Sequence, residues 1–170
     1  PVPCQNALAK AAEKISLAKN PIIIAGGGVH TSGASNELKT LQEQAYLPVA
    51  TTVMGKGSVD ETSPLSLGVA SYFMGHNGST RHMRHMIEGA DVVVLVGNRT
   101  NQNGTDSWKL YPENATYIHI DIDPQEIGRN YESIRLVGDA KTTLTMLLSE
   151  LKKTDLTKRA SASAALEIAI

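Results

Sequence analysis

The stretch from residue 21 to residue 33 constrains the fold more than any other part of the chain. It begins with the apolar run Pro-Ile-Ile-Ile-Ala and continues into three consecutive glycines, Gly26, Gly27 and Gly28. A short β-branched run of this kind is typical of a strand buried on both faces, as in a parallel sheet. A helix is predicted at residues 36–46. A strand, a glycine turn and a helix N-terminus together form a common phosphate-binding arrangement in α/β proteins.

The glycine turn differs from the known phosphate-binding fingerprints. Thr31 stands where G-x-G-x-x-G has its third glycine. A second turn, Gly55-Lys56-Gly57, lacks the Ser or Thr that follows the lysine of a P-loop. A tight turn between a strand and a helix also needs glycine for its geometry alone. The turn by itself therefore leaves both phosphate binding and a purely structural role open.

The rest of the chain alternates predicted helices with continuous apolar runs. This alternation predicts an α/β fold, a three-layer Rossmann-like domain whose mostly parallel sheet is covered by helices on both faces. Residues 58–75 and 98–114 are predicted to be irregular. The remaining helices are predicted at residues 6–19, 76–89 and 140–152, and the remaining strands at residues 48–53, 91–97, 116–122 and 133–137.

Length and composition are those of one globular domain. The chain has 170 residues, of which 41% are hydrophobic and 19% charged, and its net charge of −1 favours neither nucleic acid nor an anionic membrane as a partner. No apolar run is long enough to span a bilayer. The single cysteine, Cys4, cannot form an internal disulfide, which fits a cytoplasmic location. We expect a linker at residues 1–5, the domain at residues 6–153, and a linker or tail at residues 154–170.

The ends of the predicted strands carry the candidate binding residues. In open α/β sheets, ligands bind at the carboxyl ends of the strands. Arg99 could pair with a phosphate, because its planar fork matches that geometry, and Asp121 could accept bonds from a ribose or an adenine amine. Asp139 precedes a predicted helix and could simply cap it. Taken together, glycine at four of the five strand ends favours nucleotide binding.

Neither a metal site nor a catalytic residue is predicted. His76, His82 and His85 lie close in sequence, but no carboxylate has the usual partner spacing and Arg81 and Arg84 would repel a cation. We interpret these histidines as surface residues. The chain also lacks the G-x-S-x-G turn of a hydrolase.

The strand ends, taken in order, resemble the central domain of thiamine-diphosphate-dependent enzymes of the acetolactate synthase type. The resemblance covers about residues 6–152, nearly the whole chain, and its most specific part is the run His-Ile-Asp-Ile-Asp-Pro-Gln-Glu-Ile-Gly at residues 119–128. The other matching pieces are residues 20–28, 48–57, 75–78 and 90–99.

The resemblance implies a domain of about six parallel strands that binds FAD, as in acetolactate synthases, or ADP, as in oxalyl-CoA decarboxylases. The present sequence departs from the acetolactate synthase pattern after Arg99, where Thr-Asn-Gln-Asn stands in place of acidic residues and a second arginine. The resemblance therefore does not choose between the two nucleotides. Carried over by motif, the cofactor-binding residues are Gly26, Gly27, Gly28, Thr52, Val53, Met54, Gly75, His76, Gly97, Asn98, Arg99, Asp121, Ile122, Asp139 and Ala140.

The resemblance also implies a larger enzyme. Thiamine diphosphate and Mg would be bound by flanking catalytic domains of the same chain, in a homodimer or homotetramer. That enzyme would be a carboligase or decarboxylase, and so a transferase or lyase, acting on a 2-oxo acid. The activating glutamate and the G-D-G diphosphate motif of those domains do not occur here, so we expect the fragment alone to be inactive. Two other hypotheses remain: an independent NAD-binding oxidoreductase domain, and a non-catalytic scaffold with an empty nucleotide site.

Overall fold

A computed structural model describes residues 1–170, and it contains one six-stranded sheet. The strand order is β3-β2-β1-β4-β5-β6, and every neighbouring pair is parallel, which confirms the predicted α/β fold. The chain winds outward from β1 in one direction and then returns to β4 to wind in the other. The strands are β1 (Pro21–Ala25), β2 (Val49–Thr51), β3 (Ser66–Val69), β4 (Val92–Val96), β5 (Thr116–Asp121) and β6 (Ser133–Val137).

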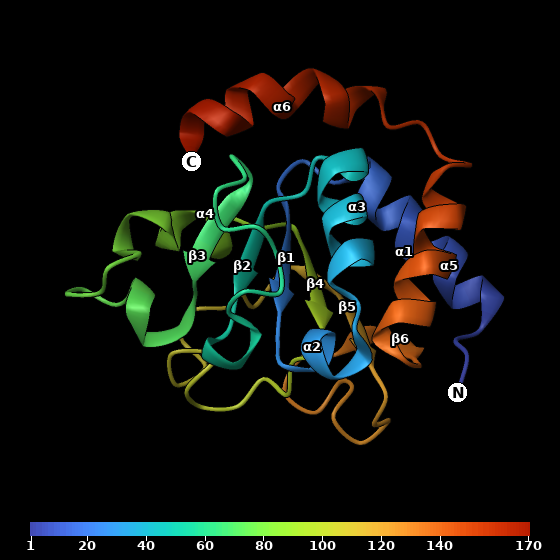
Figure 1. The fold of residues 1–170 in the computed structure, drawn as a ribbon, viewed down its shortest axis with the longest axis horizontal. Helices are drawn as coiled ribbons and strands as arrows, with labels where there is room; N and C mark the ends of the chain where they lie inside the picture. The colour runs from blue at the N-terminus through green and yellow to red at the C-terminus, as the bar shows by residue number, and fades with distance from the viewer.

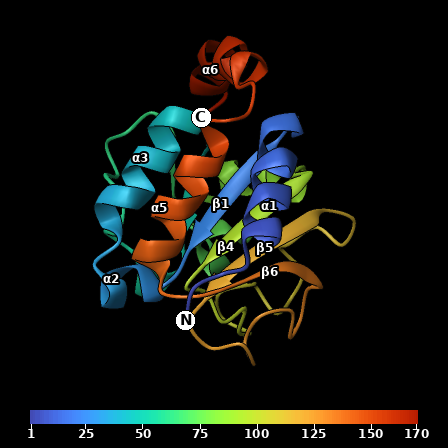
Figure 2. The same cartoon turned by 90° about the vertical axis from the view of Figure 1, so that its right-hand side faces the viewer.

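The two faces of the sheet are covered differently. Helices α1, α3 and α5 pack on one face over a core of 24 buried residues (Figures 1 and 2). The other core has 14 buried residues and is covered by α4 and irregular segments. The helices are α1 (Gln5–Leu17), α2 (Gly28–Ser32), α3 (Ser35–Ala45), α4 (Arg84–Glu88), α5 (Ala140–Leu151) and α6 (Thr157–Ala169), with 3-10 turns η1 (Val53–Gly55), η2 (Ser71–Met74) and η3 (Arg81–Met83).

The central strands explain the continuous apolar runs of the sequence. Every residue of β1 and β4 is buried, and Ile23 is paired in register with Val94. Successive side chains of a strand point to opposite faces. Ile23 therefore lies in the larger core, whereas Ile22 and Ile24 lie in the smaller one. A strand that serves two cores needs no polar face.

Three segments differ from the expectation. Residues 58–75, expected to be irregular, contain the edge strand β3, whose register shifts against β2 and whose Gly68 has a φ of +77°. The helix expected at residues 76–89 is limited to residues 81–88, as η3 followed by α4. Residues 157–169, expected in a linker or tail, form helix α6.

Helix α6 crosses the amino edge of the sheet, at the end of the molecule opposite to α2 (Figures 1 and 2). It is mostly exposed, and Arg159 is its one buried side chain. No helix of the structure, α6 included, combines the length and the apolar character that crossing a membrane requires. The amino edge and the carboxyl edge of the sheet thus differ in how they are covered.

Candidate functional site

A cavity of about 790 Å³ lies at the carboxyl edge of the sheet, where the chain changes its winding direction between β1 and β4. This is the position at which open α/β sheets bind ligands. Its lining includes thirteen of the fifteen residues expected to bind a cofactor, while Gly75 and His76 lie outside it. The thirteen are Gly26, Gly27, Gly28, Thr52, Val53, Met54, Gly97, Asn98, Arg99, Asp121, Ile122, Asp139 and Ala140.

Six further residues line the cavity without having been expected from the sequence. Three of them belong to α2, and three to the polar loop that follows β4. The first group follows the glycine turn directly, and the second lies beyond the point where the family pattern stops matching. They are His30, Thr31, Ser32, Asn101, Asn103 and Gly104.

The lining side chains of the cavity change in character along the sheet, because its walls follow the ends of four adjacent strands. At the end beyond β2, Val53 and Met54 are 48% and 75% exposed. The middle is formed by the glycine turn after β1 and by Arg99 after β4, and the far end by Asp121 and Ile122 after β5. Three strand spacings separate β2 from β5, which is about 14 Å. An extended ligand lying across the strand ends would thus meet Val53 and Met54 first, then the glycine turn and Arg99, and then Asp121 beside the exposed Ile122.

Gly26 and Gly97 are required for backbone packing within the protein, independently of any ligand. A Cβ on Gly26 would collide with the Gly97 carbonyl oxygen, because the turns after β1 and β4 cross closely. Gly97 has a φ of +55°, a conformation that side chains disfavour, and its own Cβ would meet the backbone of Gly28. Part of the glycine pattern therefore reflects backbone packing and not ligand contact.

Gly27 and Arg99 offer free donors that could receive an anion. The amides of Gly26 and Gly28 donate to the carbonyls of Val96 and Gly97, whereas the Gly27 amide donates to nothing within the chain. The Arg99 side chain is exposed, and no carboxylate lies within ion-pair distance of it. A free amide and a free guanidinium suit a phosphate oxygen.

The two carboxylates of the cavity have different roles. Asp139 caps α5, because its oxygens accept from the Thr142 amide at 3.0 Å and the Ser32 hydroxyl at 2.7 Å. These bonds, the Thr142 amide first, lower the pKa of Asp139. Asp121 is 9% exposed, and one of its oxygens accepts from the Asp123 amide while the other has no partner in the chain. Asp121 is therefore the carboxylate that can accept bonds from a ligand.

A buried network holds the loop that carries Arg99. His119 donates through Nε2 to the Asn98 carbonyl at 2.9 Å, because a carbonyl only accepts, and burial lowers the pKa of His119. The Asn98 amide donates to the Tyr111 hydroxyl at 3.0 Å, which donates in turn to the Gly104 carbonyl at 3.1 Å. None of these contacts was expected, because they join residues that are distant in sequence.

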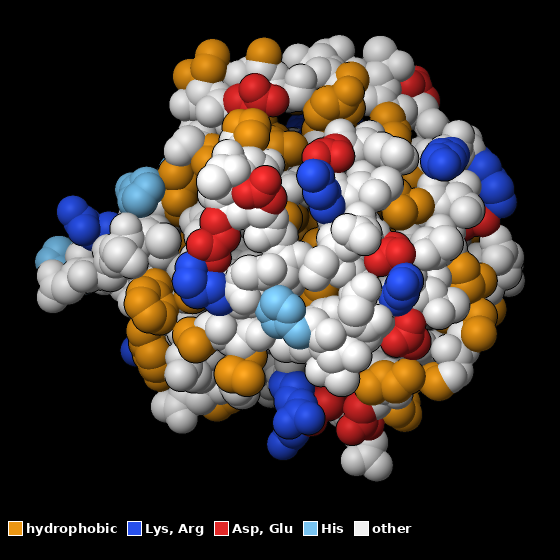
Figure 3. Space-filling view, viewed as in Figure 1, with side chains coloured by type: hydrophobic (Ala, Val, Ile, Leu, Met, Phe, Trp, Pro, Cys, Tyr) orange, Lys and Arg blue, Asp and Glu red, His pale blue; other side chains and the backbone are white.

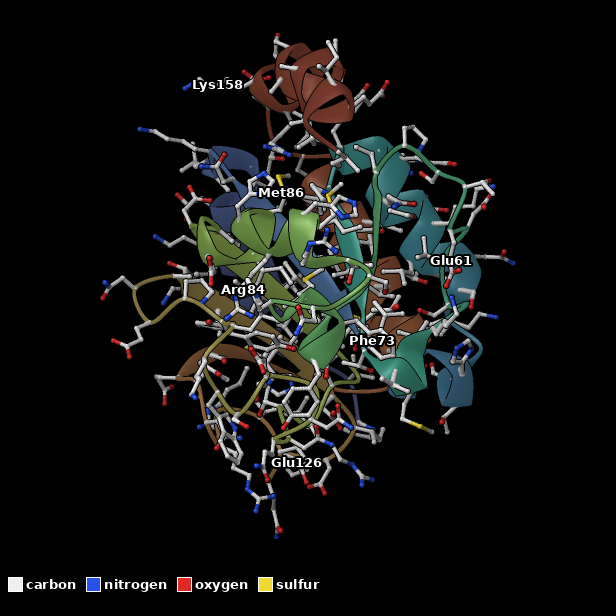
Figure 4. All side chains as sticks on the ribbon, turned by 90° about the vertical axis from the view of Figure 1, so that its left-hand side faces the viewer. Glu61, Phe73, Arg84, Met86, Glu126 and Lys158 are labelled. Carbon is white, nitrogen blue, oxygen red and sulfur yellow. The ribbon has the colours of Figure 1, made fainter.

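The three neighbouring histidines do not converge. His85 bonds through Nδ1 to the His82 carbonyl at 2.8 Å, and His76 lies in the irregular segment before η3. Arg84, labelled in Figure 4, forms ion pairs with Glu88 and with Asp106. No group of three or more His, Cys, Asp or Glu side chains in the structure is arranged to hold a metal ion.

Comparison with known proteins places this geometry in a family. Residues 8–147 match the family model described as thiamine pyrophosphate enzyme, central domain. Proteins described as probable acetolactate synthase large subunits from Methanococcus aeolicus and Methanocaldococcus jannaschii are each 43% identical over 143 residues, which cover 84% of this chain and 23% of theirs. An acetolactate synthase from Arthrospira platensis is 36% identical over 140 residues, which cover 82% of this chain and 24% of the relative.

A solved structure has the same fold. The X-ray structure of a protein described as a thiamin diphosphate-dependent enzyme from Mycobacterium smegmatis superposes with a TM-score of 0.70 at 25% identity, covering 91% of this chain and 29% of that one. The present chain thus spans about a quarter of the length of the relatives it matches. The chain belongs to the family of thiamine pyrophosphate enzyme central domains.

Proposed function

We propose that this chain is the nucleotide-binding central domain of an acetolactate synthase-like enzyme, and that the cavity at the carboxyl edge binds the diphosphate and adenosine of FAD or ADP. The graded lining across four strand ends carries the proposal. Gly27 and Arg99 would hold the diphosphate at the middle. Asp121 would accept from the ribose or the adenine amine, beside Ile122.

The apolar end of the cavity bears on the choice between the two nucleotides. Val53 and Met54 lie exposed on the cavity wall at the end opposite to Asp121. Exposed apolar side chains in a cavity are usual contacts for a flat ring. FAD has such a ring beyond its diphosphate, whereas ADP ends there. FAD would therefore cover Val53 and Met54, and ADP would leave them exposed.

The activity belongs to the whole enzyme in this proposal. Flanking domains of the same chain would bind thiamine diphosphate and Mg and would act on a 2-oxo acid, as transferase or lyase, within a cytoplasmic homo-oligomer. Acetolactate synthase is the activity that the relatives' descriptions state. This chain would supply no catalytic residue. It would supply a folded support and the nucleotide site.

Calorimetric titration of the 170-residue chain with FAD, ADP and NAD tests the nucleotide site. We expect saturable binding of an adenine nucleotide, and weakening by Arg99→Gln of about tenfold, because a charge-assisted contact to phosphate is lost. Arg81→Gln is the matched control, since Arg81 is exposed and lies outside the cavity lining. FAD binding more tightly than ADP would assign the apolar end to the flavin ring.

Two results would overturn the site assignment. Equal affinities of the Arg99→Gln variant and the parent chain would remove Arg99 from the phosphate site. No binding of any nucleotide, either to this chain or to the full-length enzyme that contains it, would favour the scaffold hypothesis. Selective binding of NAD with reduction of the cofactor would favour the oxidoreductase hypothesis.

A further inference from the structure

Helix α6 forms an arch over the amino edge of the sheet, because it is attached at both ends and not in the middle. At its start, Leu156 packs against the larger core and Arg159 is buried. At its end, Ile170 packs against the smaller core. Between these contacts lies a second hollow, of about 380 Å³. Such a volume is close to the lower limit for ligand-binding pockets, about 300 Å³.

The hollow has apolar walls and a basic rim. Figure 3 shows hydrophobic side chains gathered along the line where α6 meets the rest of the molecule, and Figure 4 shows Met86 on the α4 side of that line. The polar lining contains Lys19, His85 and Arg159, together with Asn20, and no carboxylate. The apolar lining consists of Pro21, Ile22, Pro48, Met86, Ala162, Ala165, Leu166 and Ala169.

Arg159 is the unusual residue of this hollow. Its side chain is only 3% exposed, and no carboxylate lies within ion-pair distance of it. The guanidinium donates to the carbonyls of Ala45 at 3.4 Å, Lys19 at 3.3 Å and Tyr46 at 2.5 Å. The carbonyls of Ala45 and Tyr46 lie at the C-terminal end of α3, where the helix dipole favours a cation, and the Lys19 carbonyl lies in the turn between α1 and β1.

The three carbonyls do not use all the hydrogen-bond donors of Arg159. A guanidinium has five N–H donors, and only three meet acceptors within the chain. Burial lowers the pKa of Arg159, and the charge of Asp91, which forms no ion pair with it, acts in the opposite direction. A buried cation of this kind gains most from a carboxylate, because the planar fork matches the two carboxylate oxygens. His85 lines the same hollow, and its Nδ1 donates to the His82 carbonyl.

We propose that the hollow beneath α6 is a second binding site, for a small carboxylate with a hydrocarbon tail. Arg159 would receive the carboxylate, and the tail would lie between Ile22, Met86 and the alanine face of α6. The chemistry of the walls selects this class. A polyphosphate would find a single buried guanidinium among apolar side chains, and a neutral hydrocarbon would leave that guanidinium without an anion.

Titration of the 170-residue chain with sodium octanoate tests the site, by calorimetry and by amide chemical shifts. We expect saturable one-to-one binding, with the shift changes confined to α6, α4 and the start of β1. Octanol and octylamine have the same tail without the carboxylate, and each should bind at least about tenfold more weakly, since the charge-assisted hydrogen bonds are missing. Octanol binding as tightly as octanoate would overturn the role of the carboxylate.

Two pairs of variants locate the site. Ala165 lines the hollow and Ala164 does not, so Ala165→Phe should abolish octanoate binding and Ala164→Phe should leave it unchanged. Arg159→Met should weaken binding at least about tenfold. Its control is Lys158→Met, because Lys158 points away from the molecule (Figure 4).

The outcomes are independent of the nucleotide site, which lies at the opposite edge of the sheet. Ala165→Phe keeps Arg159 and the attachment of α6, so it separates loss of the hollow from loss of the helix. Undiminished octanoate binding in Ala165→Phe, or no saturable binding to the parent chain, would overturn the proposal. Neither result would change the expected binding of ADP or FAD.

Discussion

The two edges of the sheet are built in opposite ways. At the carboxyl edge, turns from several strands pack backbone against backbone, and a buried network joins β5 to the loop after β4. At the amino edge, α6 spans a hollow and is fixed at its start chiefly by Arg159. The cavity at the carboxyl edge is held by many contacts, because the topology of the fold brings several turns together there. The hollow at the amino edge is held by few contacts, because a single helix covers it.

This difference predicts which substitutions disturb which edge. Changes at the carboxyl edge should destabilise the whole domain, because the crossing turns belong to the central strands. Changes at the amino edge should loosen α6 and leave the rest folded. The following experiments test that distinction.

The largest effect is expected for Gly97→Ala. The new methyl group would meet the backbone of Gly28, and the residue already has a positive φ, so the free energy of unfolding should fall by about 3 kcal/mol. Gly33→Ala is the matched control, because Gly33 has a φ of +63° with no atom within 4 Å of the added Cβ, and its cost should be about 1 kcal/mol. Urea unfolding measures both. Equal losses in the free energy of unfolding of the two variants would mean that the close packing of the turns after β1 and β4 does not stabilise the domain.

Tyr111→Phe should have the next largest effect. Removal of the hydroxyl leaves the Asn98 amide and the Gly104 carbonyl without their partner, which should cost about 2 kcal/mol. The affinity for ADP should fall as well, because Arg99 lies on the same loop. Tyr46→Phe is the control, since the Tyr46 hydroxyl makes no hydrogen bond to the side chains or backbone around it. Unchanged stability and unchanged ADP affinity would show that the network does not shape the loop.

Arg159→Lys tests how α6 is attached at the amino edge of the sheet. Lysine keeps the charge but cannot reach three carbonyls with a planar fork, so α6 should be less firmly attached by about 1 kcal/mol. Hydrogen exchange of the α6 amides should accelerate, while exchange in β1 and β4 stays as in the parent chain. Acceleration throughout the sheet would contradict the distinction between the two edges. Lys158→Arg serves as the control for a basic substitution on the same helix.

The smallest effect is expected on the stability of the domain at acidic pH. The pKa of Asp139 is lowered by the Thr142 amide and the Ser32 hydroxyl, so its contribution to stability is present above the ordinary pKa of 3.8 and is lost as the pH falls through the lower folded value. Asp139→Asn keeps a good helix cap that does not titrate. Between about pH 5 and about pH 3, the variant should lose less stability than the parent chain, by under about 1 kcal/mol. An identical pH profile in urea unfolding would rule out this role of Asp139.

The pattern of apolar residues predicted the central strands of the sheet better than the edge strand and the segment that follows it. The strands β1 and β4 are buried on both faces, so their sequences are apolar throughout and easy to recognise. The edge strand β3 is short and contains Gly68 at a positive φ, and its sequence therefore resembled a loop. The helix expected at residues 76–89 was too long, because its first residues form turns packed against η2.

The cavity was predicted more completely than the contacts that support it. Gly26, Arg99 and Asp121 each follow a strand, and parallel strands bring such positions to one edge. The bonds of His119 and Tyr111 join residues whose contact only the folded chain creates. Asn101 and Asn103 line the cavity for the same reason.

The sequence by itself determined the alternation of buried strands and helices, the parallel sheet and the edge at which a ligand could bind. These follow from hydrophobic periodicity and from chain direction, which are local properties. Only the tertiary structure decided that Arg159 is buried, that α6 arches over a second hollow and that Tyr111 supports the loop of Arg99. Each of these depends on which distant carbonyls and side chains the fold brings within hydrogen-bond distance, and that information is not contained in any single segment.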